Sequence, residues 1–342
     1  MKPTIAVKFL IASFFHSAGI VSTKIRNNSA ETLALMYHRV IPIREAGDML
    51  QDGMYVEPET FEIHVQFLLK YFRLVSTPEL SNALRNKRRN SDHKPFCILT
   101  FDDGWYDFYR YAFPILKTFS VPATVFVPTD FIGTSKWFWT DRLMHLFFQR
   151  NRPAYSARIS ELSSVTLVNQ LEAIKGSLEF RIERAIEILK GFHDDEIERA
   201  ISELSTRWGF DSEPQGRAFL SWDEVREMKN SGLITFGSHT ASHRILTILS
   251  DNEIEDELIR SKQKLIAEKA IDPTCIPFCY PNGNYNAKTA KLVKEMGYHL
   301  AVTTENGWND GKADLFRLRR IGIHEDITST EAMFGCRIVG IL

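Results

Sequence analysis

The chain has 342 residues, a formal net charge of -1 and a composition that is 44% hydrophobic and 25% charged. This length and balance are typical of a soluble globular enzyme with one large domain or two ordinary ones. The near-neutral charge gives no reason to expect a nucleic-acid partner.

The first 30 residues are predicted to form a helical arm or a weak signal or anchor segment. Lys2 and Lys8 precede an apolar run at residues 9–15, and Lys24 and Arg26 follow it. The run is too short and too polar for a membrane span and lacks a clean cleavage site. A signal or anchor, a helix lying on a membrane or on the domain, and a plain helix all stay open. The partner implied by the second alternative is a membrane surface, contacted peripherally.

Four cysteines, at positions 97, 275, 279 and 336, show neither a metal-knuckle spacing nor a dense disulfide pattern. We expect free, mostly buried thiols, which favours a reducing compartment. A cytoplasmic or membrane-peripheral location is therefore favoured over export.

The first predicted strand, residues 32–40, contains His38 near its end. A helix is expected over 58–72, where apolar residues recur at helical spacing. A second helix is expected to start with Thr77 as N-cap and Pro78 as its first residue.

A short apolar strand at 96–99 leads into Asp102, Asp103 and Gly104. Side chains that are adjacent on an extended segment point to opposite sides, so the two carboxylates cannot do the same job. One can face a metal while the other faces an attacking water molecule. The alternative is a strand-to-helix turn with a capping Asp.

Helix and strand then alternate, with a helix over 108–119 and a strand over 122–127, which predicts βα units and a parallel sheet. From about residue 140 to about 215 no strand is evident, and apolar residues recur at helical spacing. We interpret this stretch as a helical insertion. The aromatic residues at 137–139 either line a sugar groove or anchor the insertion.

A second short strand, residues 233–236, leads into His239 and His243. Their spacing of four places both imidazoles on one face of a helical turn. One carboxylate plus two imidazoles is a metal-ligand set with open positions. The rest of the chain continues the alternation, with helices expected at 251–270 and 287–296 and strands at 276–278, 297–304 and 318–323.

The segments 100–104 and 238–243 together resemble the motifs of the polysaccharide deacetylase family, the NodB-type carbohydrate esterases. Both motifs occur in the family's order, each after an apolar strand. The resemblance implies a distorted (β/α) TIM-like barrel, an α/β fold, over residues 31–330, interrupted by the insertion. Residues 331–342 would be a C-terminal segment.

The resemblance also implies roles for the motif residues. Asp103, His239 and His243 would hold a divalent metal, most simply zinc, with cobalt or nickel as alternatives, and Asp102 would be the general base. Residues 279–283 resemble a third motif that contributes to an oxyanion site, which makes Tyr280 a candidate substrate or orienting residue. The arginine common before that proline is missing, and Arg320 is the candidate to replace it in orienting Asp102.

The general acid has two candidates. Most members of the family take it from a histidine on a late strand, which would be His324 here. However, the Leu-x-x-His pattern is matched better by His38, as in the circularly permuted branch that includes poly-N-acetylglucosamine deacetylases. We expect His38 to be the acid, and a core role for His38 is a further alternative.

The expected function is metal-dependent hydrolysis of the amide of N-acetylated sugars in a poly- or oligosaccharide. An O-acetyl carbohydrate esterase with the same site and a catalytically inactive carbohydrate-binding protein are the alternatives. Nothing in the sequence predicts an oligomeric state.

Overall fold

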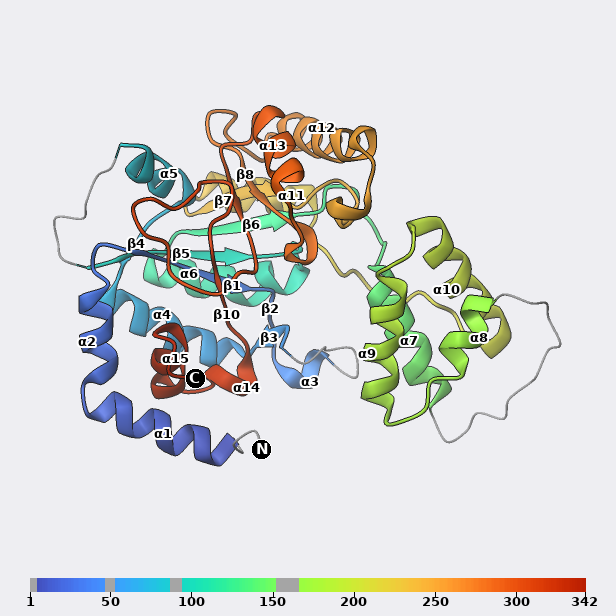
Figure 1. The fold of residues 1–342 in the computed structure, drawn as a ribbon, viewed down its shortest axis with the longest axis horizontal. Helices are drawn as coiled ribbons and strands as arrows, with labels where there is room; N and C mark the ends of the chain where they lie inside the picture. The colour runs from blue at the N-terminus through green and yellow to red at the C-terminus, as the bar shows by residue number, and fades with distance from the viewer. Residues whose placement is uncertain (1–4, 47–52, 87–93, 152–165) are drawn as a thin grey trace. The chain divides into compact units, whose positions relative to one another are not determined.

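The computed structural model describes residues 5–46, 53–86, 94–151 and 166–342 (Figure 1). These residues form two compact units. We call the described parts of 1–46, 50–134 and 219–342 the barrel unit, and those of 135–218 the helical unit.

The barrel unit is built on an eight-stranded sheet in which all strand pairs are parallel. The strand order is β10-β1-β5-β6-β7-β8-β9, and β4 also pairs with β5. The strands are β1 (Thr32–Tyr37), β4 (Arg73–Leu74), β5 (Phe96–Phe101), β6 (Ala123–Val127), β7 (Ile234–Ser238), β8 (Pro277–Cys279), β9 (Leu300–Val302) and β10 (Ile321–Gly322). A separate two-stranded sheet pairs β2 (Arg39–Val40) with β3 (Tyr55–Val56).

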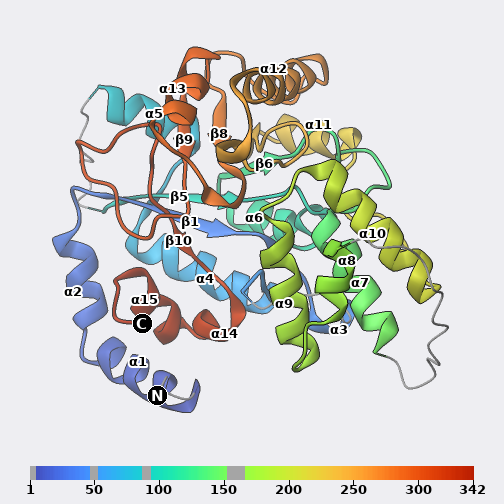
Figure 2. The same cartoon turned by 45° about the vertical axis from the view of Figure 1, so that its right-hand side comes forward.

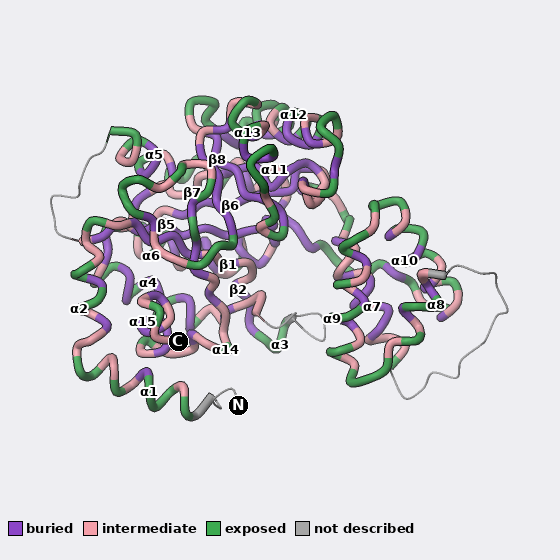
Figure 3. Tube along the Cα trace, viewed as in Figure 1, coloured by how far each residue is buried: buried purple, intermediate pink, exposed green. Residues whose placement is uncertain are grey.

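This sheet confirms the predicted barrel-like α/β fold, as a curled half-barrel. The first and last strands, β1 and β10, are neighbours, with Leu35 opposite Ile321. The carboxyl ends of parallel strands meet at one edge, so segments that are distant in sequence converge there. The central strands are buried (Figure 3), as their almost continuously apolar sequences predict for parallel strands.

Helices flank the sheet, with α11 and α12 against β7 and with α4 and α5 beside β4 and β5 (Figure 2). The helices of the barrel unit are α1 (Ile5–Ser17), α2 (Ile20–Asn27), α3 (Ile43–Ala46), α4 (Pro58–Tyr71), α5 (Thr77–Arg85), α6 (Phe113–Phe119), α11 (Trp222–Asn230), α12 (Asp251–Ala267), α13 (Ala287–Glu295), α14 (Glu325–Thr328) and α15 (Glu331–Ile338). Short turns η2 (Phe108–Ala112), η3 (Leu246–Ile248) and η4 (Pro281–Gly283) complete it.

Several element boundaries differ from expectation. The strand expected at 32–40 divides into β1 and β2, and the strand expected at 297–304 shortens to β9. Ser76, not Thr77, caps α5, because its side chain accepts the N–H of Glu79 and completes a capping box. The predicted helix at 108–119 begins as the π-helical turn η2 and becomes α-helical just before Pro114, which lies in the first turn of α6. The last strand shortens to Ile321–Gly322.

The helical unit contains α7 (Trp139–Arg150), α8 (Thr166–Glu172), α9 (Leu178–Leu189) and α10 (Asp194–Trp208). Its own apolar core includes Leu146, Phe147, Ile201 and Trp208. Trp139 packs against that core and Phe138 is buried. Trp139 therefore contributes to the packing of the helical unit itself.

Candidate metal centre

The two acidic residues after β5 have different backbone conformations. The Asp102 N–H donates to the Tyr37 carbonyl at 3.0 Å and so continues the strand. Asp103 has a φ of 75° and Gly104 a φ of 68°, both in the left-handed region. A Cβ at position 104 would lie 2.8 Å from Cγ1 of Val127, so this turn requires glycine. The turn sends the two carboxylates to different partners.

His239 and His243 lie in a loop after β7, and the predicted helical turn is wrong. Thr240 and His243 have left-handed φ values of 64° and 65°, which an α-helix does not contain. The His239 N–H donates to the Val127 carbonyl at 3.0 Å, so the loop starts in register with β6. The two imidazoles meet because the chain reverses, not because of helical periodicity.

Glu257 of α12 anchors this loop. Its buried carboxylate accepts the N–H groups of Ala241 and Ser242, each at 2.9 Å, and the Ser242 hydroxyl at 2.6 Å. Bonds to a charged acceptor are stronger than bonds between neutral groups. Glu257 therefore holds the loop that carries both histidines.

Asp103, His239 and His243 form one compact set of donors. Oδ1 of Asp103 lies 3.5 Å from Nε2 of His239 and 3.3 Å from Nε2 of His243. These atoms all lie within 4.8 Å of one another. One carboxylate and two imidazoles at this separation fit a divalent ion such as zinc and leave coordination positions open.

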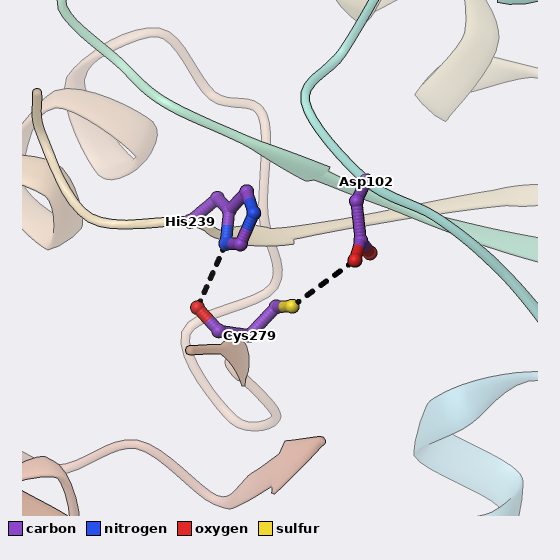
Figure 4. Close-up of side chains that lie close together, drawn as sticks. All are labelled: Asp102, His239 and Cys279. Atoms are coloured by element: carbon purple, nitrogen blue, oxygen red, sulfur yellow. Dashed lines mark hydrogen bonds between the residues drawn. The ribbon is translucent and has the colours of Figure 1, made fainter. Parts of the chain in front are cut away.

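The surroundings orient each donor of this set. The ring of His239 bonds through Nδ1 to the Cys279 carbonyl at 2.8 Å, which directs Nε2 toward Asp103 (Figure 4). The Trp105 indole donates to Oδ2 of Asp103 at 3.0 Å. Burial alone would raise the pKa of Asp103, but hydrogen bonds from both histidines hold that pKa well below its usual range. Asp103 is therefore anionic.

Asp102 is paired with Arg320, a fully buried guanidinium from the segment before β10. Nη1 and Nη2 of Arg320 donate to Oδ1 and Oδ2 of Asp102, both at 2.7 Å. Arg320 also donates to the Thr303 carbonyl and to the Thr100 hydroxyl. Burial acts to raise the pKa of Asp102, and Arg320 more than offsets this, so that the pKa of Asp102 lies below its ordinary value. The structure thus places Arg320 where it orients Asp102 and keeps it ionised.

A second set of possible metal donors is Asp102, His239 and Cys279 (Figure 4). The thiol of Cys279 lies 3.5 Å from Asp102 and accepts a hydrogen bond from Nη2 of Arg320 at 3.2 Å. Both oxygens of Asp102 already face that guanidinium. A cation here would meet a buried positive charge, so the donor set around Asp103 is the better metal site.

His38 reaches the same edge of the sheet. Tyr37 is paired with Phe101 across β1 and β5, so His38 is in register with Asp102. Its imidazole contributes to lowering the pKa of both Asp102 and Asp103. His38 is therefore close to the candidate base and to the metal set.

His324 follows β10 and is in register with His38, because Met36 pairs with Gly322. Its ring, however, is hydrogen-bonded through Nδ1 to Asp326, and its backbone forms the N-cap of α14. His324 is therefore engaged within its own segment, while His38 is close enough to both aspartates to help lower their pKa.

Tyr280 has a fully buried side chain. Its hydroxyl donates to the Phe316 carbonyl at 3.1 Å and its ring stacks on Tyr285. A substrate contact through this hydroxyl would require that hydrogen bond to break. The geometry supports a packing role beside Cys279 for the side chain.

Sequence reasoning missed Cys279, Glu257 and Trp105 as residues that support the site. Trp105 follows the acidic motif directly, so an aromatic residue at that place was a signal that could have been used. Cys279 lies in the segment 279–283 that resembles a third motif, but that resemblance gives its thiol no role. Glu257 carries no local signal, because it reaches the site through the packing of α12.

The comparisons with known proteins agree with this geometry. Residues 89–301 match the family model of the polysaccharide deacetylases. The chain therefore belongs to the polysaccharide deacetylase family, hydrolases that act on N-acetyl amide bonds of carbohydrates.

Individual relatives are distant. The chain is 23% identical over 290 residues to YxkH of Bacillus subtilis, a protein assigned to the same family, covering 84% of this chain and 70% of the relative. It is 30% identical over 122 residues to a poly-beta-1,6-N-acetyl-D-glucosamine N-deacetylase of Staphylococcus epidermidis, covering 33% of this chain and 41% of that protein. The structure of the Streptococcus pyogenes deacetylase PplD with acetate superposes with a TM-score of 0.56 at 22% identity, covering 89% and 96% of the two chains.

Proposed function

We propose that this chain removes the acetyl group from N-acetylated amino sugars of a poly- or oligosaccharide in a metal-dependent hydrolysis, giving a free amine and acetate. One observation carries the proposal. Asp102, held as a carboxylate by the buried Arg320, is adjacent to the Asp103, His239 and His243 set. A base beside an open metal set is what hydrolysis of an unactivated amide needs.

Each residue of the site then has a separate chemical role. A divalent ion held by Asp103, His239 and His243 would lower the pKa of a water molecule and polarise the acetyl carbonyl. Asp102 accepts the proton of that water as the new C–O bond forms. When the C–N bond breaks, His38 donates a proton to the departing nitrogen, so that the sugar leaves as an amine. Arg320 keeps the Asp102 carboxylate oriented throughout.

The name of the Staphylococcus epidermidis relative supports poly-N-acetylglucosamine as the first substrate to test. Two other functions use the same residues. An O-acetyl carbohydrate esterase would need the metal set and the base but less help from an acid, because an alkoxide leaves more easily than an amide nitrogen. A catalytically inactive carbohydrate-binding protein would have no use for the Asp102–Arg320 pair, which argues against it.

The deciding experiment measures acetate released from β-1,6-linked N-acetylglucosamine oligomers, from chitin oligomers and from O-acetyl xylan. Each is measured with a chelator and after adding back zinc, cobalt or nickel. We expect metal-dependent release from an N-acetylated oligomer. Release from O-acetyl xylan alone would show an esterase, and binding without release under every metal would show an inactive protein.

The metal assignment is tested on its own. His239→Ala and His243→Ala should each lose bound metal and activity while the far-ultraviolet circular dichroism spectrum stays unchanged. Stoichiometric zinc in both purified variants would contradict this ligand set.

A further inference from the structure

The helix α1 exposes an apolar stripe to solvent. Val7, Leu10, Ile11 and Phe14 are spaced i, i+3, i+4 and i+7, which is one face of a helix. Leu10 and Phe14 are each 67% exposed, more than any other large apolar side chain among the described residues. Such spacing normally marks the face that a helix buries in the core. An exposed stripe of this kind marks an interaction surface.

This apolar stripe is exposed although α1 packs against α15. On the opposite side of α1, Ala12 is fully buried against α15, and its carbonyl accepts the Cys336 thiol at 3.7 Å. Figures 1 and 2 both show α1 lying beside α15, and Figure 3 shows much of its surface exposed. The outward stripe is therefore a fixed feature of the barrel unit.

The charges around α1 indicate which partner it fits. The first 30 residues contain four basic residues, Lys2, Lys8, Lys24 and Arg26, and no Asp or Glu. Among those that the structure describes, Lys24 and Arg26 are exposed on α2. A second copy of this chain would bring a like charge against this surface, which disfavours a symmetric dimer. An anionic lipid surface complements both the charge and the apolar stripe.

We propose that α1 lies in the interfacial region of an anionic bilayer, with Val7, Leu10, Ile11 and Phe14 facing the acyl chains and with Lys24 and Arg26 near the headgroups. The 13 residues of α1 span about 20 Å, so the helix lies in the membrane plane. No described helix is long and apolar enough to cross a membrane. The enzyme is then held at a membrane surface without a spanning segment. This proposal does not depend on which sugar is hydrolysed.

The test is co-sedimentation of the full chain with vesicles of phosphatidylcholine alone or mixed with phosphatidylglycerol, at low and high salt. We expect binding to the anionic vesicles that weakens as salt rises. The double variant Leu10→Gln, Phe14→Gln should bind them at least about tenfold more weakly, because the inserted apolar area is lost. The matched control is Ile259→Gln, Ile266→Gln, which alters two exposed residues of α12 and should bind as the native chain does.

A second variant tests the charge. Lys24→Gln, Arg26→Gln should bind anionic vesicles more weakly and with a flatter salt dependence. Unchanged acetate release by all variants would show that they are folded. Three results would overturn the proposal: no binding of the native chain to anionic vesicles, a mature protein whose intact mass lacks α1, or a dimer in solution that Leu10→Gln, Phe14→Gln dissociates.

Discussion

Asp102 and Asp103 are neighbours in the chain, but one contacts a guanidinium and the other contacts two imidazoles. Asp102→Asn should therefore keep the metal and reduce turnover by a factor of about 100 to 10,000, the usual contribution of a general base. Asp103→Asn is the matched variant and should lose the metal.

Metal analysis and acetate release on the same samples separate the two aspartates. Removing the charge of Asp102 leaves Arg320 buried without its counter-ion, so unfolding by urea is measured alongside to correct for lost stability. If Asp102→Asn loses the metal while remaining folded, the two aspartates share the ligand role.

His38 and His324 follow neighbouring strands in the same register. The imidazole of His38 helps to lower the pKa of both aspartates, whereas His324 is hydrogen-bonded to Asp326. His38→Ala should strongly reduce N-deacetylation and affect hydrolysis of nitrophenyl acetate much less, because a nitrophenolate leaves without a proton. His324→Ala is the control and should reduce neither by much. The reverse pattern would place the acid on the C-terminal strand.

At the residue scale, the sequence was sufficient to select the aspartates and histidines that the structure brings together at the candidate site. Aspartate, histidine and glycine in short motifs are constrained by the reaction, so they can be recognised from spacing and type. Arg320 was only a candidate for orienting Asp102, because an arginine on a terminal strand is usually at the surface. Burial and a bidentate pair, both tertiary facts, single it out.

Among the elements, α12 supports the candidate site without contributing a metal donor. Glu257→Ala would leave the N–H groups of Ala241 and Ser242 without their acceptor and loosen the histidine loop. We expect metal affinity to fall about 10- to 100-fold, the usual effect of removing a group that orients a ligand. Competition with a chromophoric chelator measures this.

The control for this variant is Glu255→Ala on the same helix, which makes the same substitution without a bond to the loop. It should leave metal affinity unchanged. Equal affinities for native protein and Glu257→Ala would show that the loop holds its shape without α12.

The prediction of a helical turn at His239 and His243 is wrong because of the backbone conformation of the loop. A spacing of four predicts a common face only where the backbone is helical. Here the N–H of His243 bonds to the Thr240 hydroxyl and not to the His239 carbonyl, as a helical turn requires. Both Thr240 and His243 adopt left-handed conformations. Glu257 then holds the loop in this shape through the N–H groups of Ala241 and Ser242. The sequence contains no local sign of an acceptor 15 residues away.

At the scale of the whole molecule, His64 of α4 connects its helix to β1, α14 and α15. Nε2 bonds to the Thr328 carbonyl at 2.7 Å, Nδ1 accepts from the Tyr37 hydroxyl at 3.2 Å, and the ring stacks on Phe334. Burial excludes the charged form and lowers the pKa of His64 from 6.5 to about 4. The folded state therefore binds fewer protons than the unfolded chain between these two values.

The free energy of unfolding that depends on neutral His64 is fully present above about pH 6.5 and is lost as the pH falls toward about 4. From about pH 7.5 to about pH 5 the loss is about 2 kcal/mol. Urea unfolding at both values measures it, and His64→Gln, which cannot be protonated, should show a smaller difference. His193→Gln, at an exposed position, is the control. An equal pH dependence in native protein and His64→Gln would contradict this role for His64.

The sequence by itself determined the family, the alternation of strands and helices, and the residues Asp102, Asp103, His239 and His243 as a set. These follow from local patterns, because short apolar strands and reactive side chains can be recognised in the sequence from residue type and spacing. Only the tertiary structure decided that β1 lies between β5 and β10, which places His38 opposite Asp102. Only it also brought Arg320, Cys279 and Glu257 to the site, because contacts over such sequence distances depend on how the sheet curls and on which helix packs where.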